Sequence, residues 1–177
     1  AKLFLPSRLR GGVSSRLTGD GDIEFGEYIA GRRPVILPAD AEIRGAFDSR
    51  GNVSLAAGSL TLWQSFVHPT GRVDLQNQST LNLLGTAKIT TLGAQAASII
   101  CGGDVEIGTL QSISSLILRQ SVVFRVNGDA KLGNSFQATG PGLAEFLGTT
   151  TVPQGVGVLF GHTTVRNRGT WRYAEGG

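Results

Sequence analysis

Gly71-Arg72-Val73-Asp74-Leu75 is the stretch that decides the fold of this chain. A glycine is followed by any residue, a small or branched apolar residue, a polar residue, and then Leu, Ile or Phe. A turn glycine followed by alternating apolar and polar residues predicts a short strand whose apolar side chains point inward. The pattern recurs at residues 21–25, 51–55, 85–89, 103–107, 128–132 and, more loosely, 142–146.

The spacing of these patterns predicts a β-solenoid. From Gly51 to Gly142 their starts are 20, 14, 18, 25 and 14 residues apart, and no window has the spacing of an amphipathic helix. Repeats of this size without helices are typical of chains that coil strand upon strand. We therefore expect an all-β parallel β-helix with about 20 residues per coil. A β-sandwich is the alternative, but the chain has few of the Asn-Gly and Asp-Gly turns that join antiparallel strands.

The sequence pattern divides the chain into two parts. Residues 1–41 are expected to form an N-terminal docking segment, because an apolar strip at 3–5 is followed by a basic stretch rich in Gly and Ser. Residues 42–177 are expected to form the solenoid body. The ends of such a body expose unpaired strand edges, and no amphipathic helix is seen that would cap them. The last expected strand, 170–174, alternates well and offers an edge that a neighbour can extend.

Composition and charge exclude some classes of function. The chain has 177 residues, 40% of them hydrophobic, and a formal net charge of +3, so it folds and shows no charge signature of nucleic-acid binding. No run approaches the roughly 18 apolar residues of a membrane helix. Residues 51–118 carry only five charged side chains, far below the usual share of about 25%. Such a surface is expected to be covered by a partner, another copy or glycan, or to consist of Ser and Thr that pair across strands.

The single cysteine and the two histidines do not form a recognisable site. Cys101 ends an apolar run and is expected to be buried, with an intermolecular disulfide as the alternative. His68 stands next to Pro69 and His162 follows Gly161, so both are expected in surface loops. Neither histidine belongs to a zinc-binding spacing.

Carboxylates are the only candidates for catalysis or metal binding. A hydrolytic pair needs two carboxyl groups about 5–9 Å apart with different pKa values. Asp74, Asp104, Glu106 and Asp129 are expected to face outward, and solvation on the surface is the favoured interpretation. The acidic run at 20–24 has oxygen ligands that suit calcium, but a solvated turn is favoured. The sequence thus predicts no enzyme, no catalytic residue, no metal and no cofactor.

Two sequons and three aromatic residues are candidate contact points. Asn52 and Asn77 each begin an Asn-X-Ser sequon, which accepts glycan in a glycosylating secretory route. Trp63 is out of phase with the apolar positions before it and is expected to face outward, where it suits stacking on a sugar. Trp171 and Tyr173 share one face of the last strand and suit a protein interface or the end of the core.

The glycine-led units between about 42 and 150 resemble the coils of extracellular parallel β-helix proteins. That group includes autotransporter and filamentous-haemagglutinin-type adhesins, phage tailspikes and pectin-lyase-like enzymes. The chain departs from the adhesin type in its irregular spacing and its few asparagines. The resemblance implies a secreted or surface-displayed rod, and it carries over no functional residue.

Together these features predict a structural or adhesive extracellular module that self-assembles or forms part of a longer fibre or spike. The expected partners are copies of itself or adjoining repeats of a longer chain. The expected contact residues are Leu3, Phe4 and Leu5 at one end and Trp171 and Tyr173 at the other. The alternative is a glycan-binding or glycan-cleaving module of the tailspike kind, and a component of a virion surface stays open.

Overall fold

The structure is a computed structural model of the chain, and it is all-β. It describes residues 3–10, 15–16, 22–31, 35–37, 40–43, 47–49, 52–55, 58–76, 78–155 and 157–174. Side chains are described for 42–43, 52–55, 58–76, 78–133, 135–155 and 157–174. None of the described residues forms a helix long and apolar enough to cross a membrane.

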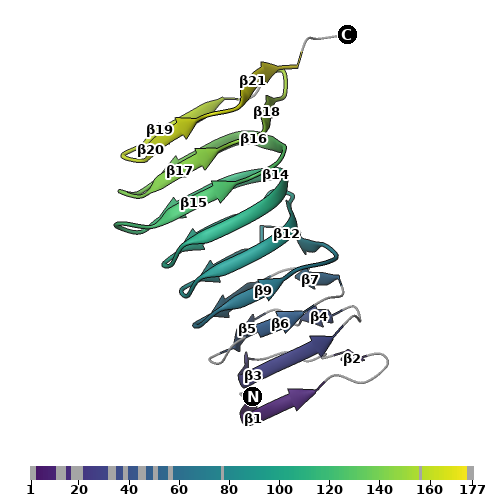
Figure 1. The fold of residues 1–177 in the computed structure, drawn as a ribbon. Helices are drawn as coiled ribbons and strands as arrows, with labels where there is room; N and C mark the ends of the chain where they lie inside the picture. Colours follow the sequence, from purple (N-terminus) through teal and green to yellow (C-terminus); the bar gives the residue numbers. More distant parts are fainter. Residues whose placement is uncertain are drawn as a thin grey trace.

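The described strands stack along one axis from the N-terminal to the C-terminal end (Figure 1). In chain order they are β1 (Leu3–Arg10), β2 (Ser15–Arg16), β3 (Asp22–Gly31), β4 (Val35–Leu37), β5 (Asp40–Ile43), β6 (Phe47–Ser49), β7 (Val53–Leu55), β8 (Ser59–Leu62), β9 (Phe66–His68), β10 (Val73–Leu75), β11 (Thr80–Leu83), β12 (Ala87–Ala94), β13 (Ser98–Cys101), β14 (Val105–Leu118), β15 (Val123–Val126), β16 (Ala130–Thr139), β17 (Leu143–Phe146), β18 (Thr149–Val152), β19 (Val158–Gly161), β20 (Thr164–Asn167) and β21 (Thr170–Tyr173).

Strand pairing confirms the β-solenoid. Every pair of described strands is parallel, and paired residues are about one coil apart, as in the match of Val53 with Val73. A β-sandwich would pair neighbouring strands in antiparallel hairpins, so that alternative is excluded. Parallel pairing of short strands without helical crossovers requires each turn of chain to return to the same place one rung higher.

Each turn has three faces. The first face includes β5, β8, β11, β13 and β19; the second includes β6, β9, β15, β17 and β20; the third includes β2, β4, β7, β10, β18 and β21. The longer strands β1, β3, β12, β14 and β16 bend from one face to the next, so each contributes to more than one ladder. The sequence pattern predicted two strands in each unit; the third strand is a difference from that expectation.

The three faces explain the irregular spacing of the glycine-led pattern. The copies at 51–55, 71–75 and 128–132 lie on the third face, whereas those at 85–89, 103–107 and 142–146 lie on the second. Steps within one face are close to one full turn, such as the 18 residues from Ala87 to Val105. Steps between faces are longer or shorter than one turn, which produces the intervals of 14 and 25 residues.

The core is a column of apolar side chains that runs along the axis. Within a rung the inward residues alternate with outward polar ones, as the pattern predicts. On the second face, large and small side chains follow one another from Phe66 to Ala87, Val105, Phe124 and Ala144, all nearly or fully buried. Tight packing of this kind is what gives the stack its rigidity.

The backbone of strands β1 to β5 joins the same parallel ladders. β1 pairs with β3, and β3 pairs in turn with β5 and β6. Strands β1 to β4 fall in the segment 1–41, and β5 crosses its boundary. The side chains of residues 1–41 are not among the described ones. A boundary at residue 41 between a docking segment and the body therefore stays a prediction.

Candidate functional site

We define the last turn as β19, β20 and β21. It exposes side chains at positions whose counterparts are buried in every preceding described turn. Phe160 lies in register with Leu116 and Ala138, which are fully buried, yet it is 39% exposed. Tyr173 follows Val152 in the same way and is 74% exposed. These side chains occupy core positions with no further rung above them among the described strands.

An aromatic cluster lies beneath this exposed surface. Trp171 is half-buried and packs edge-on against Phe146 and Phe160, with ring centroids 6.0 and 6.3 Å apart. Phe160 also meets Phe136 edge-on at 6.2 Å. Edge-to-face contacts at these distances stabilise aromatic pairs. The cluster holds the last turn on the stack and keeps its upper side apolar.

The strands of the last turn are paired on one side only within the described chain. β19 pairs with β16, β20 with β17 and β21 with β18. In a parallel sheet the other edge of each strand presents backbone N–H and C=O groups that another strand can use. The last turn therefore combines an apolar surface with three open strand edges.

The residues predicted for the opposite end share the same ladders by register. Leu3 stands in the column that leads through Ala41 and Leu81 to Phe160. Phe4 stands in the column of Thr61, whose side chain faces outward. By its backbone position Leu5 belongs to the inward set and Phe4 does not. Whether these three residues form an interface stays a prediction.

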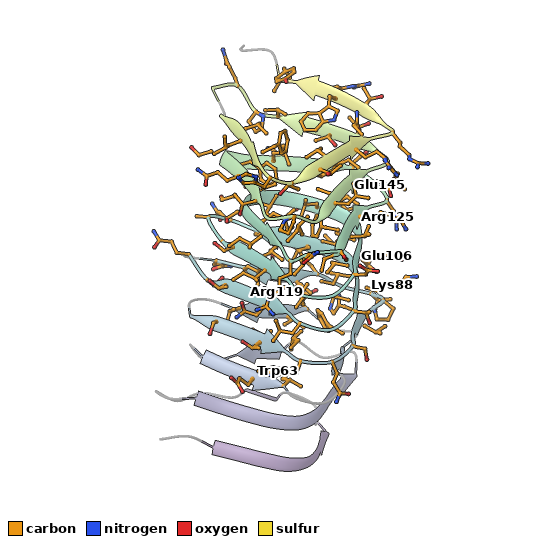
Figure 2. The ribbon with its side chains drawn as sticks, turned by 90° about the vertical axis from the view of Figure 1, so that its left-hand side faces the viewer. Trp63, Lys88, Glu106, Arg119, Arg125 and Glu145 are labelled. Atoms are coloured by element: carbon orange, nitrogen blue, oxygen red, sulfur yellow. The ribbon has the colours of Figure 1, made fainter. Side chains whose placement is uncertain are left out.

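A ladder of alternating charges follows the outward side of the second face. Lys88, Glu106, Arg125, Glu145 and Arg166 occupy consecutive rungs of one column. We call this column the charge ladder, and Figure 2 shows its labelled members one above another along one side of the rod. Each neighbouring pair is joined by an ion pair, with nitrogen to oxygen distances from 2.8 to 3.7 Å.

Glu145 is the centre of the charge ladder. Its side chain is only 4% exposed and meets Arg125 Nε at 2.8 Å, Arg168 Nε at 3.1 Å and Arg166 Nη1 at 3.6 Å. The hydrogen bond that Arg125 donates, together with the positive charges of the three arginines, lowers the pKa of Glu145 although burial opposes the shift. The carboxylate therefore stays charged and ties the last turn to the turn before it.

The carboxylates considered for catalysis have structural partners. Asp104 Oδ1 accepts a hydrogen bond from the backbone of Val123 at 2.9 Å, and Asp129 Oδ1 accepts one from Thr149 at 3.1 Å. In both cases the second residue of a glycine-led pattern holds the start of a strand one turn higher. Asp74 pairs with Arg72. Glu106 belongs to the charge ladder. Asp104, Asp129 and Glu106 thus link successive turns, whereas the partner of Asp74 lies on the same strand.

The third face carries a groove of about 740 Å³ in volume. Its lining includes Gly93, which stands between Asp74 and Gln111 in the outward column. The side chain of Arg72 lies beside this glycine: its Nε pairs with Asp74 and its Nη1 donates to Gln111 Oε1 at 2.7 Å. Further up, Lys131 and several threonines line the groove.

The remaining predicted contact residues are not gathered at one site. Trp63 is 44% exposed and lies after β8 (Figure 2), away from the residues that line the groove. Asn52 is exposed, and its Oδ1 accepts a hydrogen bond from the backbone of Arg72 at 3.1 Å. Asn77 lies outside the described residues. Glycosylation at the two asparagines and sugar contact at Trp63 stay predictions.

The structure confirms the expectation for Cys101 and corrects the one for His68. Cys101 is fully buried, and burial raises the pKa of its thiol, so the group stays protonated. The expectation that His68 lies in a surface loop is wrong. It ends β9, is fully buried and lies with its ring 5.9 Å from that of Phe66. Alternation places Phe66 and His68 inward, and the turn begins only after His68.

No metal site is found in the described part of the chain, where no group of three or more His, Cys, Asp or Glu is placed to hold an ion. The acidic run at 20–24, the alternative calcium site, lies outside the described side chains.

Comparison with known proteins identifies no relative. No family model, curated protein or solved structure matches the chain at a significant level. The structure supports the β-solenoid part of the resemblance seen in the sequence. An adhesin, tailspike or pectin-lyase-like character is a matter for proposal.

Proposed function

We propose that this chain is a structural or adhesive module of a longer fibre or spike, in which another parallel turn covers the last turn. The observation that carries the proposal is the exposure of core positions at Phe160 and Tyr173 on top of a fully packed column. Exposed apolar surface of this kind, next to open strand edges, marks an interaction surface.

Other features support a structural role. The outward carboxylates are engaged between turns, as at Asp104 and Asp129, which favours scaffolding over catalysis. Outward polar side chains on the first face also join turns: Asn82 donates to Thr61 Oγ1 at 3.0 Å. A rod held together in this way is suited to an extracellular or surface-displayed setting, including a virion surface, and to partners that continue its ladders.

Small-angle X-ray scattering over a concentration series tests the proposal. In about 1 M salt, where charges are screened beyond about 3 Å, we expect the particles to lengthen with concentration at constant cross-section. A Tyr173→Arg variant is expected to lose this lengthening, because it places a charge on the exposed core position.

Leu159→Arg is the matched control. Leu159 is 55% exposed and lies on β19, but it stands one position away from the inward Phe160. It is expected to leave the lengthening intact. Equal behaviour of the two variants, or particles of fixed length at every concentration, contradicts the proposed function.

The third-face groove favours glycan binding as a second candidate function. Its lining combines two cations, Arg72 and Lys131, and two anions, Asp74 and Asp129, with amide and hydroxyl groups. This balanced lining suits a hydroxyl-rich neutral chain better than a nucleic acid. A glycan array with wild type and a Gln111→Ala variant tests this candidate. Binding that Gln111→Ala weakens and a Trp63→Ala variant leaves unchanged supports the groove; the reverse result supports the site predicted at Trp63.

A further inference from the structure

The C-terminal part of the rod carries a surplus of positive charge. Residues 119–174 contain six basic residues and two acidic ones, whereas residues 51–118 contain two basic residues and three acidic ones. A surplus of one sign on part of a surface raises the local concentration of ions of the opposite sign. This part of the rod is therefore where a negatively charged ligand is expected to bind.

Part of the surplus is gathered around Glu145. Arg125 Nε lies 2.8 Å from its Oε2. Arg168 Nε and Arg166 Nη1 lie 3.1 and 3.6 Å from its Oε1. Two cations thus share one carboxylate oxygen, and like charges held so close together repel each other unless further negative charge is present.

The cluster has more cations than carboxylates. Its net charge is +2, from Lys88, Arg125, Arg166 and Arg168 with Glu106 and Glu145. Arg125 lies between two carboxylates, because it meets both Glu106 and Glu145. Among the described side chains, Arg166 and Arg168 meet Glu145 alone. The uncompensated charge therefore lies at Arg166 and Arg168.

Arg166 and Arg168 keep most of their hydrogen-bond donors free. A guanidinium group has five N–H groups, and each of these two residues faces Glu145 with one nitrogen. Neither forms another ion pair or side-chain hydrogen bond within the described part of the chain. Their side chains are 51% and 61% exposed. Two guanidinium groups that meet at one oxygen thus offer unused donors to solvent.

This cluster lies on the flank of the rod. Arg166 is in register with Glu145 on the second face, and Figure 2 shows Glu145 and Arg125 along one side of the stack. A turn stacked on β19, β20 and β21 would leave that side open. A ligand bound there is therefore compatible with the proposed function but does not depend on it.

The charge and the donors of the cluster select one chemical group. A phosphate monoester carries about −1.5 to −2 charges near pH 7 and has three strong acceptor oxygens. It can compensate the excess charge and accept hydrogen bonds from two guanidinium groups at once, which arginine forks are well shaped to donate. A carboxylate or a phosphate diester brings a single negative charge and compensates only part of the excess.

We propose that Arg166 and Arg168, held together by the buried carboxylate of Glu145, form a binding site for a phosphate monoester. Glu145 is a positioning residue, since it orients the two guanidinium groups from beneath and does not touch the ligand. The phosphate group belongs either to a soluble molecule, such as a phosphorylated sugar, or to a lipid headgroup, because both present the same three oxygens.

NMR titration of the wild-type protein with glycerol phosphate tests the proposal. At a constant ionic strength of about 0.15 M, charges more than about 8 Å apart are largely screened. We expect saturable binding, with the largest amide shifts in β17 and β20. Arg168→Gln is expected to weaken it about tenfold or more, because charge-assisted hydrogen bonds are lost. Dimethyl phosphate, a diester with one charge, is expected to bind more weakly than glycerol phosphate.

Arg172→Gln is the matched control. Arg172 is an exposed arginine of the last turn on the third face, and it forms no ion pair among the described side chains. The variant makes the same change in net charge as Arg168→Gln, and it is expected to bind glycerol phosphate as wild type does. Equal weakening in the two variants, equal binding of monoester and diester, or no saturable binding to wild type overturns the inference.

Lipid vesicles distinguish the two sources of the phosphate group. Phosphatidic acid presents a phosphate monoester on a membrane surface, whereas phosphatidylcholine presents a diester. Cosedimentation with vesicles that contain phosphatidic acid, abolished by Arg168→Gln, supports the site with a lipid ligand. Binding of glycerol phosphate without cosedimentation supports the site with a soluble ligand. Failure of both defeats the inference alone, whereas absence of lengthening in the scattering series defeats the proposed function alone.

Discussion

Gly128 shows how closely successive turns approach each other. A Cβ atom at this position would lie 2.6 Å from the carbonyl oxygen of Gly108 in the turn below, and the same corner is occupied by Gly148 and Gly169 in the turns above. A side chain at any of these positions meets backbone rather than a movable side chain. Glycine is therefore required at this corner by contact between turns, in addition to its use as a turn residue.

We predict that Gly128→Ala lowers the free energy of unfolding by about 1–3 kcal/mol, the usual effect of overpacking. Urea unfolding followed by far-UV circular dichroism measures the loss. Gly157→Ala is the control, because a Cβ atom there meets nothing within 4 Å, and its effect is expected to stay within about 0.5 kcal/mol. A similar loss in both variants contradicts the close approach of the turns.

Thr150 is a polar residue in an apolar column. It is fully buried between Ala130 and Trp171, and its Oγ1 has no hydrogen-bond partner among the described atoms. Replacing it by valine keeps the shape and removes a buried hydroxyl that is not satisfied. We expect Thr150→Val to raise the free energy of unfolding by about 1 kcal/mol, measured in the same urea experiment. A loss of stability shows that the hydroxyl has a partner.

At the scale of the element, the charge ladder adds to the register that the hydrophobic pattern already sets between strands. Each rung of the second face from β12 to β20 places opposite charges in line. A slip by one residue would turn every inward residue outward, and it would also break the ion pairs around Glu145. The ladder therefore adds specificity to the stack, whatever its net contribution to stability.

The pH dependence of stability tests the role of Glu145. Its folded pKa is lowered, so its contribution is fully present well above the unfolded value of about 4.3 and is lost as pH falls through the folded value. We predict that the gap in unfolding free energy between wild type and Glu145→Gln is constant near neutral pH and shrinks below about pH 4.3. A gap that stays the same down to about pH 3 contradicts this role.

Glu106→Gln is the companion variant for that experiment. Glu106 is 41% exposed and meets Lys88 and Arg125 at 3.5 and 3.7 Å. Exposed ion pairs contribute about 0–1 kcal/mol, so this variant is expected to lose less stability at neutral pH than Glu145→Gln.

The sequence was sufficient for the class of fold and for the inward face of most strands, because a turn glycine and a period of two are local signals. It was not sufficient for the third strand in each turn, since strands such as β9 begin without a glycine-led pattern. The charge ladder was also missed. Lys88, Glu106 and Glu145 each stand at the fourth position of a glycine-led pattern, but aligning them requires the face of each copy to be known.

At the scale of the whole molecule, the packed column and the exposed last turn act together. The packed column gives a rigid rod, and the apolar last turn gives it a surface to be covered. The sequence predicted Trp171 and Tyr173 as contact residues from their alternation.

Hydrogen exchange of the backbone amides in β19 to β21 is the most direct measurement of whether another turn covers this end. In dilute protein at low salt, amides bonded to the turn below, such as that of Thr164 with Gly142 O at 3.1 Å, are expected to be protected, whereas those on the open edge exchange quickly. On lengthening of the rods in high salt, the open-edge amides are expected to become protected. Open-edge amides that are already protected in dilute protein, or that stay unprotected in the lengthened rods, contradict the account.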